Sequence, residues 1–193
     1  MTKTASSKKQ LLETAARLFY QKGYRAIGVD TITEESGIGK MTLYRHFESK
    51  NDLIVAYLRA SDTKFWEEFE KATKDAFSPR DKLVAFFRSL SFYVTHPNCC
   101  GCPFLNAATE YPDSDYPGHI AALEHKESVR QRFRDLARQA GARNPGVLAD
   151  QLYLLMDGAY MAARLFKRDN PGANVVEAAI VLIDAQITGE TQT

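Results

Sequence analysis

The stretch that decides the fold is Gly37-Ile38-Gly39-Lys40-Met41-Thr42-Leu43-Tyr44-Arg45-His46-Phe47. Leu43 and Phe47 are four residues apart, so on a helix they share one face and can anchor it to a core. Met41 and Arg45 point the other way, and Thr42 lies on a flank. The outward side chains can all contact a nucleic acid. A short helix with an apolar anchor, a glycine turn before it and donors outside indicates the recognition helix of a helix-turn-helix.

Two helices are predicted before this segment. The first carries an apolar stripe at helical spacing, made of Leu11, Leu12, Ala15, Ala16 and Phe19. Ser7 followed by Gln10 fits a capping box, which predicts that this helix begins near Ser7. Gly23 suits the position just after its C-terminus. A second short helix is predicted over residues 29–36.

Positive charge is concentrated at the N-terminal end of the chain. The first 50 residues hold nine Lys or Arg against five Asp or Glu, although the 193 residues together carry a net charge of only +1. Lys8 and Lys9 lie in the first turn of the predicted helix, where positive charge opposes the helix dipole unless a phosphate is near. Simple solvation of both lysines is the alternative. A basic N-terminal part on a mildly acidic body favours nucleic-acid binding by that part.

The whole chain is predicted to be all-α, because strand patterns are weak and apolar residues recur at helical spacing. Ser49 to Asp52 form a capping signal, and Pro79 and Pro145 mark later helix starts. After residue 48, the predicted helices cover residues 49–77, 79–95, 104–110, 118–140, 145–167 and 175–187. We place a domain boundary near residue 48. It separates a three-helix DNA-binding domain, residues 1–48, from a helical ligand-binding and dimerisation domain, residues 49–193.

The last two predicted helices are apolar around most of their circumference. In residues 147–166 one stripe runs from Leu148 to Phe166, and a second contains Tyr153, Met156 and Tyr160. A helix with more than one apolar face must be covered on more than one face. We therefore expect a homodimer formed through residues 145–188. A central helix buried inside a monomer is the alternative.

Signals for secretion or membrane insertion do not stand out. No apolar run follows the first lysines, and the longest apolar run, residues 178–183, is far shorter than the ~20 residues of a membrane span. We expect a cytoplasmic protein with no membrane partner.

Residues 7–52 resemble the N-terminal domain of the tetracycline-repressor (TetR) family of transcriptional regulators. The matching elements, in the family's order and spacing, are Phe19-Tyr20-Gln21-Lys22-Gly23-Tyr24, Ile32, Ser36-Gly37-Ile38, Thr42-Leu43-Tyr44-Arg45-His46-Phe47 and Ser49-Lys50-Asn51-Asp52-Leu53. Two later segments, residues 101–108 and 123–126, also resemble the ligand-binding domain of one TetR subgroup. Gly28 stands where a threonine commonly caps the second helix, and Thr33 stands where a small alanine is usual.

The resemblance implies a transcriptional regulator rather than an enzyme, most simply a repressor that binds a pseudo-palindromic double-stranded DNA operator as a homodimer. Lys40 and His46 suit phosphates, and Arg45 can reach a guanine edge. The predicted DNA-binding set, with the two N-terminal lysines added from the charge pattern, is Lys8, Lys9, Lys40, Met41, Thr42, Tyr44, Arg45, His46 and Lys50.

The resemblance also implies a small-molecule effector that binds inside the C-terminal domain and releases the DNA. The candidate ligand-binding residues are Phe86, Phe87, Leu90, Phe104, Asn106, Glu110, Met156, Tyr160 and Arg164. Asn106, Glu110 and Arg164 are the most informative, because a buried polar group needs a partner. The apolar and aromatic candidates can equally be ordinary core residues.

Three cysteines lie close together, at Cys99, Cys100 and Cys102. Cys99 and Cys102 form a Cys-x-x-Cys pair, and Cys102 precedes a predicted helix, where the pKa of a thiol falls. Buried structural thiols and a redox-sensing or thiol-reactive switch both remain open. A metal site completed by His96 is a third interpretation, but the crowded spacing leaves little room for tetrahedral ligation. We predict no metal and no cofactor.

Two other function classes compete with a DNA-binding regulator. A thiol oxidoreductase built on the Cys-x-x-Cys pair usually needs a βαβ context, and strand signals for one are missing here. A helical ligand-binding module with no DNA role would show a shallow salt dependence, whereas binding to phosphates weakens steeply with salt.

Overall fold

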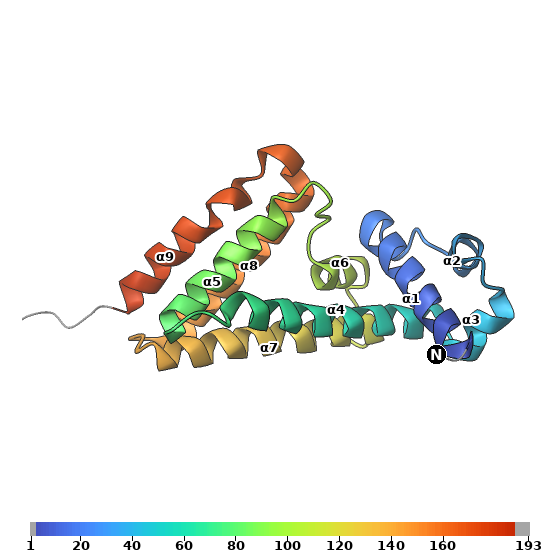
Figure 1. The fold of residues 1–193 in the computed structure, drawn as a ribbon, viewed down its shortest axis with the longest axis horizontal. Helices are drawn as coiled ribbons and strands as arrows, with labels where there is room; N and C mark the ends of the chain where they lie inside the picture. The colour runs from blue at the N-terminus through green and yellow to red at the C-terminus, as the bar shows by residue number, and fades with distance from the viewer. Residues whose placement is uncertain (1–2, 188–193) are drawn as a thin grey trace, which may run out of the picture. The chain divides into compact units, whose positions relative to one another are not determined.

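The computed structural model describes residues 3–187, and within that range the chain forms nine α-helices, two 3₁₀ turns and no strand. The all-α prediction is therefore confirmed. In chain order the helices are α1 (Lys3–Lys22), α2 (Val29–Ser36), α3 (Lys40–His46), α4 (Lys50–Thr73), α5 (Pro79–Val94), α6 (Pro103–Glu110), α7 (Pro117–Gln139), α8 (Pro145–Phe166) and α9 (Val175–Gln186) (Figure 1). None of the described helices combines the length and apolar composition needed to cross a bilayer.

Most helix ends follow the predicted local signals. Ser49 Oγ accepts a hydrogen bond from the backbone N–H of Asp52 at 3.1 Å, and the hydroxyl of Ser78 caps α5 in the same way. Two predictions are wrong. α4 ends at Thr73 rather than near Phe77, because Ser78 serves as the cap of the next helix and the chain needs a connection before it.

The second error is the capping box at Ser7 and Gln10. Both residues lie inside α1, which already begins at Lys3, so neither can cap it. Their side chains reach other helices instead. Ser7 Oγ is 3.0 Å from Nε2 of His46, and Gln10 Nε2 donates to the carbonyl of Ser36 at 2.8 Å. These contacts join α1 to α2 and α3.

The chain folds into two compact units, each made from separate parts of the sequence. The first unit contains the residues up to Lys64 together with Pro103–Glu124. The second contains Phe65–Cys102 and the residues from His125 onward. The division falls inside α4 and α7, and it places α6 in the same unit as α1–α3. The domain boundary near residue 48 stays a prediction.

The core of the first unit fixes α3 against α1 and α2. Leu11, Leu18 and Phe19 of α1 and Ile32 of α2 are fully buried. A surface ion pair between Arg17 and Glu35 also links α1 to α2. Because α3 is only one to two turns long, its position depends on this packing rather than on its own helical stability.

The core of the second unit lies among α5, α7, α8 and α9, and Figure 1 shows α5, α8 and α9 side by side. Phe86 and Phe87 of α5 both pack against Phe133 of α7, with ring centroids 5.2 and 5.9 Å apart. One charged pair is enclosed with this core: Lys126 of α7 with Asp157 of α8, both side chains largely buried.

Candidate nucleic-acid interface and effector groove

A tight turn sets the direction of α3 after α2. Gly37 has a φ of +66°, a left-handed conformation that favours glycine, and Gly39 begins α3 in an extended conformation. Leu43 is 0% exposed and Phe47 is also buried, so both anchor the inner face of the helix as predicted. Met41, on the outer face, is 91% exposed. The sequence pattern and the packing therefore agree on which side of α3 faces outward.

The nine predicted DNA-binding residues all lie in the first unit, on α1, on α3 or at the first residue of α4. Thr42, His46 and Lys50 are half-buried. The exposed members are Lys8, Lys9, Lys40, Met41, Tyr44 and Arg45. Among the described residues Arg45 makes no ion pair, so its guanidinium is free to contact a nucleic acid.

The lysines of this surface differ in their surroundings. Nζ of Lys40 lies 2.7 Å from Asp30, and this hydrogen bond and the aspartate charge raise the pKa of the lysine. Lys8 lies over the ring of Phe47, 5.6 Å from its centroid. Partial burial lowers the pKa of Lys50, while the charge of Glu110 opposes that shift. Lys40 therefore stays fully charged near neutral pH.

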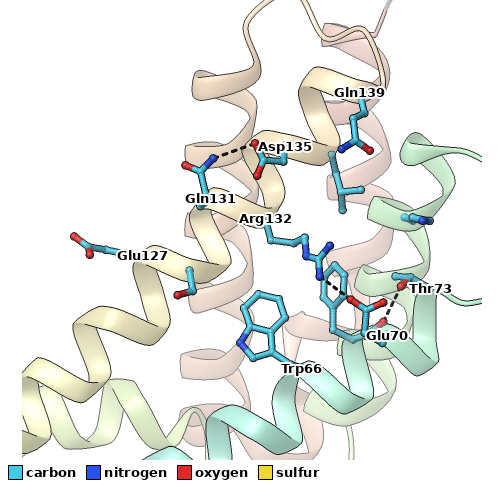
Figure 2. Close-up of a pocket in the computed structure, with 12 residues that line it drawn as sticks. Trp66, Glu70, Thr73, Glu127, Gln131, Arg132, Asp135 and Gln139 are labelled. Atoms are coloured by element: carbon cyan, nitrogen blue, oxygen red, sulfur yellow. Dashed lines mark hydrogen bonds and ion pairs between the residues drawn. The ribbon is translucent and has the colours of Figure 1, made fainter.

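A groove of about 820 Å³ opens on the second unit between α4 and α7. Its lining residues are Trp66, Phe69, Glu70, Thr73, Lys82, Glu127, Ser128, Gln131, Arg132, Asp135, Leu136 and Gln139. Figure 2 shows Arg132 reaching from α7 toward Glu70 and Trp66 of α4. Its guanidinium lies 2.6 Å from the Glu70 carboxylate and 5.6 Å from the centroid of Trp66. The groove thus combines aromatic surface with charges of both signs.

None of the nine predicted ligand-binding residues lines this groove. Those of the second unit fall into two groups. Phe86, Phe87, Leu90 and Met156 are buried in its core. Tyr160 packs edge-on against Tyr93, and Arg164 donates to the carbonyl of Cys100 at 3.0 Å.

The other three candidates, Phe104, Asn106 and Glu110, lie on α6 in the first unit. Phe104 and Asn106 are buried. Glu110 accepts hydrogen bonds from backbone N–H groups of the turn after α1. Its carboxylate is thus already bound within the protein.

The sequence analysis missed the buried pair of Lys126 and Asp157. Tyr153 belongs to the same cluster: its ring lies 5.5 Å from Nζ of Lys126, and burial together with a hydrogen bond to Asp157 raises its pKa. Removing one partner of a buried ion pair costs about 3–5 kcal/mol, because the other charge is left buried and unpaired. Asp157, which lies between Met156 and Gly158 in the apolar middle of helix 145–167, is the signal that could have revealed the pair.

The cysteine cluster lies in the connection between α5 and α6. None of the three cysteines forms a disulfide; Cys99 and Cys102 are buried and Cys100 is half-buried. Within the described part of the chain, no group of three or more His, Cys, Asp or Glu side chains is arranged to hold a metal ion.

Comparison with protein families identifies the chain's relatives. The family model described as "Bacterial regulatory proteins, tetR family" matches residues 11–57. A second model, "Tetracyclin repressor-like, C-terminal domain", matches residues 79–179, which is more than half of the chain. The chain belongs to the TetR family. The resemblance found in residues 7–52 is thereby confirmed, and with it the assignment to transcriptional regulators that are not enzymes.

Solved structures of TetR-family proteins share the whole fold. SCO4454 of Streptomyces coelicolor is 32% identical, with a TM-score of 0.90 over 95% of this chain and 97% of that one. The regulator sav143 of Streptomyces avermitilis is also 32% identical, with a TM-score of 0.84 over 93% and 97% of the two chains.

Two curated relatives that match most of the chain have lower sequence identity. The transcriptional repressor KstR2 of Mycolicibacterium smegmatis is 25% identical over 86% of this chain and 82% of its own. The transcriptional regulator AcuR of Cereibacter sphaeroides is 29% identical over 78% of this chain and 73% of its own.

Proposed function

We propose that this TetR-family chain is a homodimeric repressor that reads a pseudo-palindromic operator with α3 and is released by a small-molecule effector. The main support for this proposal is the outer face of α3. Tyr44 and Arg45 are exposed there, while Leu43 behind them is fully buried. A rigidly seated short helix with free donors outside is suited to enter a major groove. Lys8 and Lys9 lie in the second turn of α1, not in its first turn as predicted, because the helix begins at Lys3. Together with Lys40 they supply the phosphate contacts.

Salt dependence tests this proposal directly. Binding to a duplex from the flanks of the protein's own gene, followed by fluorescence anisotropy, is expected to weaken by about 10³–10⁵ between about 50 and 200 mM salt, as for six to ten phosphate contacts. A scrambled duplex of the same length serves as the control and should bind more weakly at every salt concentration. A shallow slope, or equal affinity for both duplexes, would contradict operator reading.

The proposed dimer surface is the outward face of α8 with α9. Exposed apolar residues recur on α8 at positions 147, 154, 161 and 165, which keeps a heptad-like spacing with Gln151 and Gly158 between them. Leu154 is 67% exposed and Leu165 is 75% exposed. An apolar stripe of this length on one helix needs a cover, and a second copy of the same stripe supplies one.

The groove between α4 and α7 is the proposed effector site. Its volume of about 820 Å³ falls in the range of small-molecule pockets, about 300–1,000 Å³. Its wall is continuous with the core, because Phe69 in the lining packs on Phe86 with ring centroids 5.3 Å apart. Phe86 thus lies directly behind the groove. The six candidates inferred from resemblance that lie in the second unit describe an alternative effector site.

Trp66 gives the groove a spectroscopic reporter, because it is the only tryptophan in the chain. Small aromatic compounds that raise the melting temperature are expected to quench or shift its emission. Arg132→Ala should abolish that response, since the guanidinium stands over the indole. Arg88→Ala, an exposed change on α5 away from the lining, should leave it intact. Stabilising compounds that leave the emission unchanged would place the effector elsewhere.

The thiol-based alternative has less structural support. Reactive cysteines are thiolates with solvent access, whereas Cys99 and Cys102 are buried. Cys100 is more accessible, and it offers a single thiol rather than an exposed pair. We therefore favour a non-covalent effector over a redox-sensing or thiol-reactive one.

A further inference from the structure

α6 is bonded at both of its ends to the turn that follows α1. At its C-terminal end, the carboxylate of Glu110 accepts hydrogen bonds from the backbone N–H of Tyr24 at 3.0 Å and from that of Arg25 at 2.7 Å. At its N-terminal end, the hydroxyl of Tyr24 donates to the carbonyl of Pro103 at 2.9 Å. One residue, Tyr24, thus spans the length of α6. We call these three hydrogen bonds the α6 latch.

The turn is shaped for this carboxylate. Gly23 has a φ of +90°, and a Cβ added there would lie 2.8 Å from Oε1 of Glu110. Any other residue at this position would therefore be strained and would also displace the carboxylate. Tyr24 is 1% exposed, with its ring stacked on Phe19 at a centroid distance of 5.3 Å. The latch is therefore a well-packed feature rather than a chance surface contact.

The two hydrogen bonds of the latch that Glu110 accepts are stronger than neutral hydrogen bonds. Both oxygens of Glu110 accept from backbone amides, and hydrogen bonds to an ionised acceptor are about twice as strong as neutral ones. These amides lie just after the C-terminus of α1, where the chain has left the helix. A glutamine at this position can accept with one atom only, because its amide nitrogen is a donor facing a donor.

The chain just before α6 is bonded separately within the second unit. Arg164 of α8 donates to the carbonyl of Cys100, and Gly101, with a φ of +88°, packs against Arg164 and the carbonyl of Tyr160. Only Gly101 and Cys102 separate that bonded carbonyl from Pro103. The segment just before α6 thus has its own hydrogen bond within the second unit, separate from the α6 latch.

We propose that α6 contributes to DNA binding by the DNA-reading head, the name we give to α1–α3. Glu110 and Tyr24 are positioning residues that hold α1–α3 in the orientation that binds the operator. The proposal rests on the proposed operator binding. Glu110 then acts on DNA affinity without touching DNA.

Glu110→Gln tests the latch. The variant should weaken operator binding by about tenfold, because the unlatched head spends only a fraction of its time in the competent orientation. Amide hydrogen exchange at Tyr24 and Arg25 should accelerate in parallel. The matched control is Glu67→Gln, an exposed glutamate of α4 in the second unit, which should match the wild type in both measurements. Faster exchange with operator affinity within about twofold of the wild type would show a merely structural role and overturn the proposal.

Tyr24→Phe removes only the hydroxyl at the other end of α6 and should weaken binding by about threefold. Combined with Glu110→Gln, it should cost less than the product of the two factors, since both act through one helix. If the double variant loses operator affinity by the full product of the two single losses, the two residues act independently and the shared latch is contradicted. A wild-type protein that binds no duplex would defeat the proposed function, and the role of the latch in operator binding would fall with it. A wild type that binds the operator, with a Glu110→Gln variant of unchanged affinity, would overturn the latch proposal and leave the proposed function standing.

Discussion

Arg45→Ala is expected to weaken operator binding in a gel-shift assay by more than about a hundredfold. A good side-chain contact to a base contributes about 1–3 kcal/mol, and a dimer loses two copies at once. Arg45 is exposed and makes no ion pair within the described residues, so its removal breaks no such pair there. The effect should therefore appear in binding and not in the melting temperature.

Arg88→Ala is the matched control for that experiment, because it removes the same group from an exposed position on α5 in the second unit. It should shift DNA like the wild type. Adding Tyr44→Ala to Arg45→Ala should remove the residual retardation. If the Arg45 variant retains wild-type affinity at several salt concentrations, then α3 is not the reading element.

Leu154→Glu is expected to convert the protein to a monomer, with dimer affinity reduced by more than about a hundredfold. The substitution places a carboxylate in the middle of the apolar stripe on α8, and a two-fold interface brings the two copies close together. Burying unpaired like charges is far more costly than losing one apolar contact. Operator affinity should fall together with dimerisation, because each head alone reads one half-site.

Sedimentation velocity at micromolar protein measures this outcome. The control is Leu123→Glu, which introduces the same charge at an exposed leucine of α7 in the first unit, 52% exposed. The control should remain a dimer and bind operator normally. A Leu154 variant that sediments as the wild type does would exclude this face of α8 as the interface and return the question to α9 alone.

The structural features that could be predicted well are those whose sequence signal lies within a few neighbouring residues. Leu43 and Phe47 could be assigned to the inner face of α3 from their spacing, and Ser49 to the start of α4, because both signals lie within one helical turn. The capping box at Ser7 failed for the opposite reason. The partner of Ser7 is His46, 39 residues away, and no local pattern specifies it.

The polar candidates for the effector site also have partners that no local sequence pattern specifies. Glu110 was assigned to a ligand site from the family resemblance, as a polar group that would need a partner if buried, yet its partners are backbone amides at positions 24 and 25. Backbone amides are present at nearly every residue, so a sequence cannot mark which of them bind a carboxylate. The groove at Trp66 and Arg132 likewise requires two helices about 60 residues apart to be paired first.

The division of the chain into interleaved units matters for anyone who builds chimaeras from such regulators. Since residues 103–124 fold with the N-terminal unit, a graft cut at residue 48 would pair one parent's reading head with the other parent's α6. The carboxylate at position 110 and the glycine at position 23 would then come from different sequences. Transferring operator specificity to another regulator therefore requires exchanging both segments of the first unit together, the residues up to 64 and residues 103–124.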